Sequence, residues 1–212
     1  MTYNTIMKYK CIIFDFGRVL GNFDHMVTCE KLTNYSSFNS NEIYKKIFQS
    51  GIEKEFDEGD DFENFYSEVK KTIKAKNSFT PEIFEKIWGD IFSENEGIEK
   101  VLQELSNQSI PMFLLSNTNS VHWKYIKELP VIKKFFANPH QQILSFEIGK
   151  RKPNPVIFNA GIERSNFKPE EIIYIDDILE YINAFKKLGG GGILYNCEID
   201  SIEKLQNQIQ NY

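Results

Sequence analysis

The sequence CIIFDFGRVL, residues 11–20, places the carboxylate of Asp15 directly after a short apolar run. Four apolar residues rich in Ile and Phe are typical of a buried strand, and the Asp-x-Gly that follows indicates the loop at the strand's carboxyl end. In open parallel sheets, ligands bind where such loops gather. Asp15 is therefore a candidate functional residue, although an Asp at a strand end is also a common turn former or helix cap.

Three more apolar runs resemble short strands, and helical patterns separate them. The four strand-like runs are Cys11–Phe14, Met112–Leu115, Ile172–Ile175 and Ile193–Tyr195. Between Leu20 and Met112 no such run occurs, and three segments between Ser40 and Phe92 instead carry apolar residues at helical spacing. This order predicts an α/β fold, a doubly wound parallel sheet with a helical insertion after its first strand.

The insertion predicts two structural units. We expect an α/β core made of residues 1–20 and 97–212, and a helical cap over residues 21–96. The boundaries fall near Gly21 and Gly97, where polar residues and Gly interrupt the helical pattern. The run Gly189–Gly192 is expected to end a helix and turn into the last strand.

Composition favours a folded protein and bears on its partners and its compartment. The chain has 212 residues, 41% of them hydrophobic, and a formal net charge of −5, which gives no reason to expect a nucleic-acid or anionic-membrane partner. Cys11, Cys29 and Cys197 stand far apart, which argues against a disulfide framework or a zinc site. Residues 1–10 lack the apolar core of a signal peptide, and no segment approaches the about 20 apolar residues of a membrane span. We expect a cytoplasmic protein, of an oligomeric state that the sequence leaves open.

Three further loops carry polar or charged residues. Ser116 and Asn117 follow the second run, at the expected start of a helix, where they could bind an anion or simply cap the helix. Lys152 lies in a basic loop and precedes a Pro, which favours an extended backbone that projects the charge. Asp176 and Asp177 follow the third run, and adjacent carboxylates repel each other unless a cation lies between them. Oxygen ligands on loops suit Mg²⁺.

The order of these motifs resembles the haloacid dehalogenase-like hydrolase superfamily. FDFGRVL (14–20), LLSNTN (114–119), GKRKPNPVIF (149–158) and IIYIDD (172–177) with AFKKLG (184–189) resemble its four motifs, and FDEGDDFENFY (56–66) resembles a cap-helix pattern. The similarity covers nearly the whole chain. Its Asp-x-Gly first motif is similar to that of the small sugar-phosphate phosphatases.

The resemblance implies a Mg²⁺-dependent hydrolase of small phosphomonoesters, with a small phosphorylated metabolite as partner. Asp15 would attack phosphorus and form an aspartyl-phosphate. Asp15, the carbonyl of Gly17, Asp176 and Asp177 would hold Mg²⁺. Ser116 and Asn117 would bind phosphoryl oxygens. Lys152 would neutralise both the phosphate and Asp15.

The sequence departs from the family at Gly17. Most phosphatases of the superfamily have a second Asp there, which acts as general acid and base, and its loss typically costs about 10²–10⁴-fold in rate. Asp24 is a possible substitute or only a helix cap, and His25 and His122 are weaker candidates. Tyr181 stands where this branch commonly has Asn, and the neighbouring Glu180 is either a support for the metal or a surface residue.

Two other functions remain alternatives. A haloacid dehalogenase would share Asp15, Ser116 and Lys152 but needs no metal, and Gly17 does not match its first motif. A non-catalytic binding protein on the same fold would explain the absent acid, although it has no need to keep two repelling carboxylates together. A receiver domain is excluded, because its acidic pair follows the first strand rather than a late one.

Overall fold

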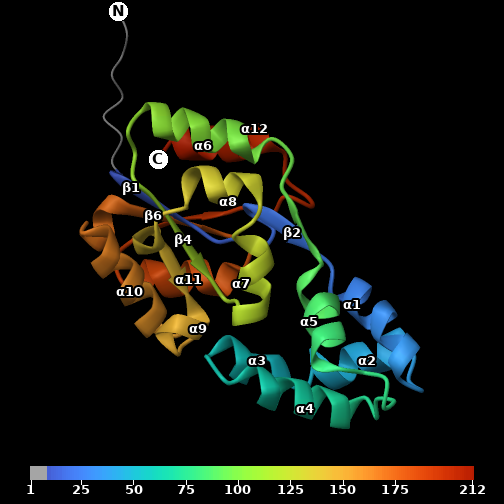
Figure 1. The fold of residues 1–212 in the computed structure, drawn as a ribbon. Coiled ribbons are helices and arrows are strands. Elements are labelled where there is room, and N and C mark those ends of the chain that lie inside the picture. Colours follow the sequence, from blue (N-terminus) through green and yellow to red (C-terminus); the bar gives the residue numbers. More distant parts are fainter. Residues whose placement is uncertain (1–8) are drawn as a thin grey trace, which may run out of the picture.

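A five-stranded parallel sheet lies at the centre of the core, in the order β5-β4-β1-β6-β7. The structure is a computed structural model that describes residues 9–212 (Figure 1). The strands are β1 (Cys11–Phe14), β4 (Met112–Ser116), β5 (Gln142–Leu144), β6 (Ile172–Asp176) and β7 (Gly191–Leu194). The α/β parallel fold is therefore confirmed. The prediction that residues 1–10 lack the apolar core of a signal peptide concerns mainly residues 1–8, which lie outside the described part of the chain.

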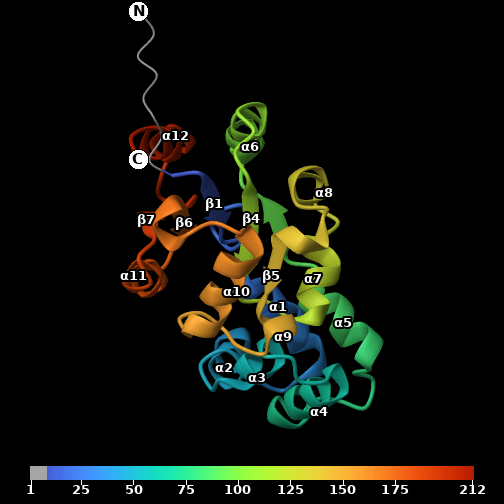
Figure 2. The same ribbon diagram turned by 90° about the vertical axis from the view of Figure 1, so that its left-hand side faces the viewer.

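Helices cover both faces of the sheet, as Figure 2 shows. On one face lie α6 (Ile98–Asn107), α7 (Ser120–Ile126), α8 (Pro130–Phe135) and α12 (Ile202–Gln210), and on the other α10 (Pro155–Ser165) and α11 (Leu179–Lys187). Strand side chains alternate between two apolar clusters, because successive residues of a strand point to opposite faces. Ile12 and Phe14 join one cluster, whereas Cys11 and Ile13 join the other.

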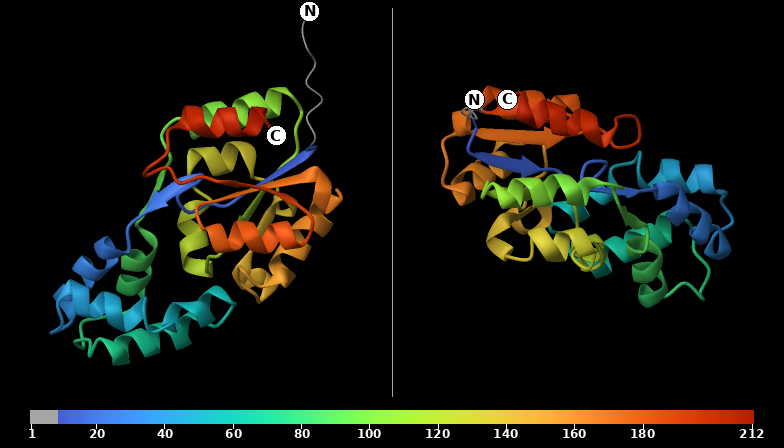
Figure 3. Two further views of the ribbon diagram at one scale, coloured as in Figure 1. Left: turned by 180° about the vertical axis from the view of Figure 1, so that it is seen from behind. Right: turned by 90° about the horizontal axis from the view of Figure 1, so that it is seen from above.

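The chain between β1 and β4 forms a separate helical group with its own apolar centre. Its helices are α1 (His25–Leu32), α2 (Ser40–Ile47), α3 (Ile52–Asp57), α4 (Phe62–Thr72) and α5 (Pro81–Gly89). Trp88, Phe65 and Phe84 are central to this cluster, and the two views of Figure 3 show the group beyond one end of the sheet. Thr80 caps α5, because its side chain accepts a hydrogen bond from the Ile83 N–H.

Three short strands were not expected from the sequence. β2 (Gly21–Phe23) and β3 (Phe92–Glu94) pair antiparallel and connect the helical group to the core, so the expectation of no strand between Leu20 and Met112 is wrong. β5 was also not expected. Each of these three strands has three residues, which are too few to show an alternating pattern. β7 starts at Gly191, two residues earlier than predicted, and a Cβ on Gly192 would lie 2.7 Å from Ile182 of α11.

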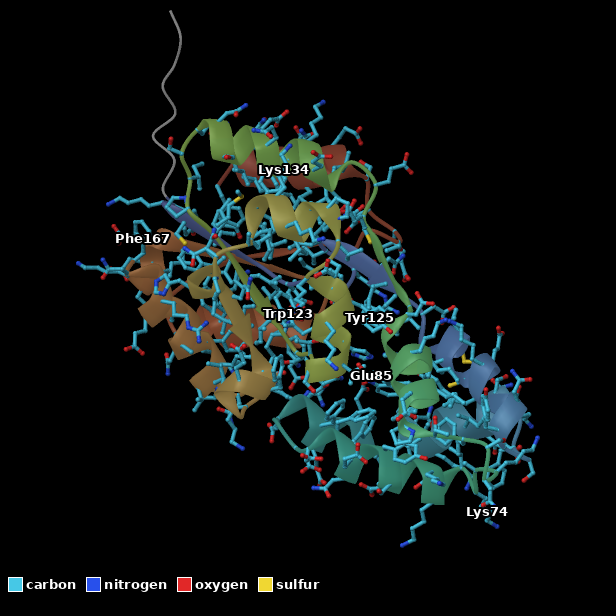
Figure 4. All side chains as sticks on the ribbon, viewed as in Figure 1. Lys74, Glu85, Trp123, Tyr125, Lys134 and Phe167 are labelled. Atoms are coloured by element: carbon cyan, nitrogen blue, oxygen red, sulfur yellow. The ribbon has the colours of Figure 1, made fainter. Side chains whose placement is uncertain are left out.

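A second contact joins the helical group to the core through α5 and α7. Figure 4 shows Glu85 and Tyr125 where these helices meet. Gly89 lies so close to α7 that a Cβ there would clash with the Tyr125 ring, and Lys124 Nζ lies 2.6 Å from Glu85 Oε1. Among residues 9–212, no helix combines the length and the apolar character needed to cross a bilayer.

The remaining short helical elements connect the larger ones. They are α9 (Ser145–Ile148) and the 3₁₀ turns Thr33–Tyr35, Pro139–Gln141 and Pro169–Glu171. α9 of the core contacts α3 of the helical group. The turn after α3 fits closely there, because a Cβ on Gly59 would lie 2.6 Å from the carbonyl oxygen of Phe146.

Candidate active site

The carboxyl ends of β1, β4 and β6 open into a pocket that the helical group also lines. The core side is contributed by Asp15, Gly17, Arg18, Ser116, Asn117, Arg151, Lys152, Asp177 and Tyr181. The helical side includes His25, Glu53 and Asp57. Asp176 lies directly behind this lining, fully buried at the end of β6. All seven residues predicted as a site are therefore brought together, because the sheet is parallel and its strand ends meet at one edge.

Lys152 connects two of the predicted carboxylates. Its Nζ lies 2.7 Å from Asp15 Oδ1 and 2.8 Å from Asp176 Oδ2, and the residue is only 4% exposed. Burial alone would lower the pKa of this amine, but the two carboxylates outweigh it and raise the pKa above its usual value. Lys152 is therefore a permanent cation at the bottom of the pocket.

The three carboxylates form a cluster that fits a divalent cation. Asp15, Asp176 and Asp177 each offer an oxygen, and these oxygens lie within 4.8 Å of one another. Burial, reinforced by the neighbouring carboxylates, raises the pKa of Asp15 to about 7 and that of Asp177 to about 6. Lys152 opposes both shifts, and Arg18 opposes that of Asp177. A divalent cation in the cluster would favour the ionised carboxylates further. An all-oxygen donor set of this kind suits Mg²⁺.

Asp176 is held from two sides. Its Oδ1 accepts a hydrogen bond of 2.7 Å from the backbone N–H of Ile178, and its Oδ2 accepts one from the Tyr174 hydroxyl. Asp177 is freer and faces Arg18, whose Nη1 lies 3.7 Å from its Oδ2. Hydrogen bonds therefore fix the orientation of the Asp176 carboxylate, whereas Asp177 is held only by the longer contact with Arg18.

The side chain of Asn117 fixes the loop that carries Lys152. Its Oδ1 accepts a hydrogen bond of 2.7 Å from the Lys152 N–H, and its Nδ2 donates to the Lys152 carbonyl at 3.2 Å. Asn119, not Ser116 or Asn117, caps α7. The helix-cap interpretation of Ser116 and Asn117 is therefore wrong, because α7 begins later than the strand end suggested.

Sequence reasoning missed a second polar cluster, where α3 meets the core. Asp57 is 4% exposed, and its Oδ1 accepts a hydrogen bond of 2.9 Å from Asn119 Nδ2. Arg151 Nε lies 3.3 Å from Asp57 Oδ2. Burial raises the pKa of Asp57 to about 6, although Arg151 opposes the shift. In the sequence, Asp57 was noticeable only as part of the segment FDEGDDFENFY. That pattern does not predict which residues Asp57 contacts.

The candidates for the missing acid have different environments. Asp24 caps α1, since its Oδ1 accepts from the Met26 N–H at 2.7 Å, and it does not line the pocket. Glu180 is exposed in the first turn of α11 and is also outside the lining. His25 and His122 do line the pocket, and burial lowers their pKa values to about 4 and about 3. Both imidazoles are neutral at pH 7.

His122 is fixed within the boundary between the helical group and the core. Its ring stacks on Trp88 with centroids 5.1 Å apart, and its Nδ1 lies 3.1 Å from Asn119 Nδ2. Asn119 therefore links His122 to Asp57. These contacts give His122 a structural role.

A comparison with known families agrees with this arrangement. The sequence model of the haloacid dehalogenase-like hydrolases matches residues 9–189. The chain belongs to this family. The matched segment contains every predicted site residue of the chain, from Asp15 to Asp177, together with the helical group.

Two curated relatives of this haloacid dehalogenase-like hydrolase carry names of phosphatases. A D-ribitol-5-phosphate phosphatase of Bacteroides thetaiotaomicron is 28% identical over 188 residues, which cover 85% of this chain and 88% of that protein. A glyceraldehyde 3-phosphate phosphatase of Methanopyrus kandleri is 24% identical over 195 residues, 81% of this chain and 76% of that one.

A solved structure supports the fold. A HAD family enzyme from Bacteroides thetaiotaomicron, in complex with magnesium and inorganic phosphate, matches with a TM-score of 0.77 at 22% identity. The match covers 92% of this chain and 98% of that one. At this level of identity, the likeness concerns the fold.

Proposed function

We propose that this hydrolase is a Mg²⁺-dependent phosphatase that acts on small phosphomonoesters through an aspartyl-phosphate. The observation that carries the proposal is the position of Lys152 Nζ, which lies 2.7 Å from Asp15 Oδ1 and 2.8 Å from Asp176 Oδ2 at the bottom of a pocket. A nucleophilic carboxylate and a phosphate dianion repel each other. A buried cation beside Asp15 reduces this repulsion.

Each core residue has a role in this mechanism. An oxygen of Asp15 attacks phosphorus, and Lys152 neutralises charge on Asp15 and on the phosphoryl oxygens. Ser116 and the backbone N–H of Asn117 bind phosphoryl oxygens. Asn117 has a second task, since its side chain holds the Lys152 backbone.

The carboxylate cluster is proposed to hold the metal. Asp15, Asp176, Asp177 and the carbonyl of Gly17 would be its protein ligands. Bound Mg²⁺ supplies positive charge that draws the phosphoryl group toward Asp15 and stabilises the charge that develops in the transition state. The oxygen-only donor set and its spacing support this assignment.

The substrate class is proposed to be sugar or polyol phosphates. The names of the two relatives point to small phosphorylated compounds with hydroxyl groups. Residues 21–96 would act as a cap that closes over the substrate, excludes water and contacts the leaving group. Pocket residues from the helical group, including Glu53 and Asp57, support this division of labour.

Phosphate release from a panel of substrates tests the proposal. We expect hydrolysis of D-ribitol 5-phosphate, glyceraldehyde 3-phosphate and 4-nitrophenyl phosphate with Mg²⁺, and no hydrolysis with excess EDTA. 2-Haloacids with chloride detection serve as the comparison. Halide release without metal would instead indicate a dehalogenase, and Mg²⁺ binding by calorimetry without phosphate release would indicate a binding protein.

A further inference from the structure

The phosphatase mechanism needs a proton donor for the leaving group, and Gly17 cannot supply one. A Cβ at Gly17 would lie only 2.8 Å from Cε1 of Phe23, whose ring occupies the space beside the residue. Phe23 belongs to β2 and packs on Phe92 and His25. Because an aromatic ring fills this position, the acid must come from elsewhere in the pocket.

Most ionisable groups of the pocket are already committed. Asp57 is bound on both oxygens, by Asn119 and Arg151. His122 is held between Trp88 and Asn119. The guanidinium groups of Arg18 and Arg151 do not release protons near neutral pH. Asp15, Lys152 and Asp177 belong to the nucleophile and metal cluster.

Glu53 is different from these groups. It lies four residues before Asp57 on α3, and residues at this spacing share one face of a helix, one turn apart. Asp57 fixes that face against the core through Arg151, the neighbour of Lys152 in sequence. Glu53 lines the same pocket as Asp15 and, among residues 9–212, its carboxyl group makes no hydrogen bond or ion pair.

We propose that Glu53, contributed by the helical group, is the general acid and base of this phosphatase in place of the group missing at Gly17. The proposal rests on the proposed phosphatase function. In the first step Asp15 bonds to phosphorus, the bond from phosphorus to the leaving oxygen breaks, and Glu53 gives that oxygen its proton. In the second step water attacks phosphorus, Glu53 takes the water proton, and the bond to Asp15 breaks, which releases phosphate.

The surroundings of Glu53 match this task. Burial raises the pKa of its carboxyl well above the usual value, the charge of Asp57 raises it further, and Arg151 opposes the shift. A carboxyl group that keeps its proton near neutral pH can act first as acid and then as base. Asp57 and Arg151 are the charged groups that face Glu53, and the pocket also contains Asp15, Arg18, His25, His122, Lys152, Asp177 and Tyr181.

His25 is the rival for this role. Its Nδ1 is buried without a hydrogen-bond partner among the described residues, and its ring lies 4.9 Å from that of Phe23. Burial and the charge of Arg18 lower its pKa to about 4, so that the imidazole is neutral near pH 7 and its one ring N–H is too weak an acid for this role. A test of Glu53 therefore includes a His25 variant.

The leaving-group dependence of kcat/KM separates these possibilities. We would compare alkyl phosphates, D-ribitol 5-phosphate and a series of substituted phenyl phosphates in the wild type, Glu53→Gln, His25→Gln and the control Glu55→Gln. Glu55 is an exposed residue of the same helix. Wild-type hydrolysis of 4-nitrophenyl phosphate establishes the phosphatase function independently, so its absence would refute that function and not the assignment of Glu53.

For Glu53→Gln we expect kcat/KM to fall about 10²–10⁴-fold for alkyl phosphates and less than about 10-fold for 4-nitrophenyl phosphate. The variant should release one equivalent of nitrophenol in a burst, because the second step lacks its base. The decrease of kcat/KM at high pH, which in the wild type reflects loss of the Glu53 proton, should disappear. Glu53→Asp should recover part of the alkyl activity.

Two results would overturn the proposal. One is an equal loss in Glu53→Gln for alkyl and aryl substrates without a burst, as expected if Glu53 only binds substrate hydroxyls. The other is the selective alkyl defect in His25→Gln instead. Thermal unfolding of each variant checks that the fold is retained.

Discussion

The charge cluster of the core and the polar cluster under α3 differ in how they are built. Asp15, Lys152 and Asp176 are held by loops of one sheet, and each buried charge has an oppositely charged partner within 2.8 Å. Asp57 and Asn119 join two units that pack around separate apolar centres. The first cluster is therefore rigid with the sheet, whereas the second depends on how the two units meet. We therefore expect changes in the first cluster to abolish the reaction, and changes in the second to alter how the helical group packs on the core.

The nucleophile gives the sharpest contrast. Asp15→Asn keeps the size of the side chain and an acceptor for Lys152 but removes the attacking carboxylate. We expect phosphatase activity to fall more than about 10⁴-fold, which is the scale of loss when a covalent nucleophile is removed. Circular dichroism should remain that of the wild type. Residual turnover above a few per cent would contradict the covalent mechanism.

Removal of the central cation should destabilise the core cluster. Lys152→Met leaves Asp15 and Asp176 buried and facing each other, and breaking a buried pair typically costs about 3–5 kcal/mol. The loss should be larger at pH 8 than at pH 5.5, because the charge pair is complete only where Asp15 is ionised, and the pKa of Asp15 is about 7 with Lys152 present. Without Lys152 this pKa should rise further, so that Asp15 is protonated at pH 5.5 in both proteins. Urea unfolding at both pH values measures the loss. A pH-independent loss would show that packing, not charge, dominates.

The boundary between the units should respond to pH through His122. Folding favours its neutral form, because its pKa is about 3 in the structure against a usual 6.5. Its contribution to stability is fully present above pH 6.5 and is lost as the pH falls toward the folded value. We expect His122→Phe to reduce the loss of stability between pH 7 and pH 5 by about 2 kcal/mol. Parallel pH slopes in the two proteins would disprove this.

The contact of α3 with the core should have a smaller and uniform effect on activity. Asp57→Asn keeps an acceptor for Asn119 but removes the charge that pairs with Arg151. We expect kcat/KM to decrease about 10-fold, corresponding to about 1.4 kcal/mol, by the same factor for aryl and alkyl phosphates. The exposed Asp60→Asn is the matched control. A defect confined to alkyl substrates would assign to Asp57 the role that we propose for Glu53.

The strands and the core site were largely predictable because their signals are local. The run Cys11–Phe14 was predicted with both of its ends correct, since four buried apolar residues fill the whole strand. Asp15, Ser116 and Asp176 then followed from their places at strand ends. The short strands β2, β3 and β5 could not be found, because three residues are too few to show a period.

The amino-acid sequence alone was sufficient for the parallel fold and for the chemistry expected of its strand ends, since both follow from short patterns along the chain. The three-dimensional contacts were needed to learn that Phe23 fills the space beside Gly17 and that Glu53 lines the same pocket as Asp15. Both facts depend on how the helical group and the core, each with its own apolar cluster, meet. No local pattern encodes that choice, because it is fixed by the packing of residues distant in sequence, such as Asp57 against Arg151.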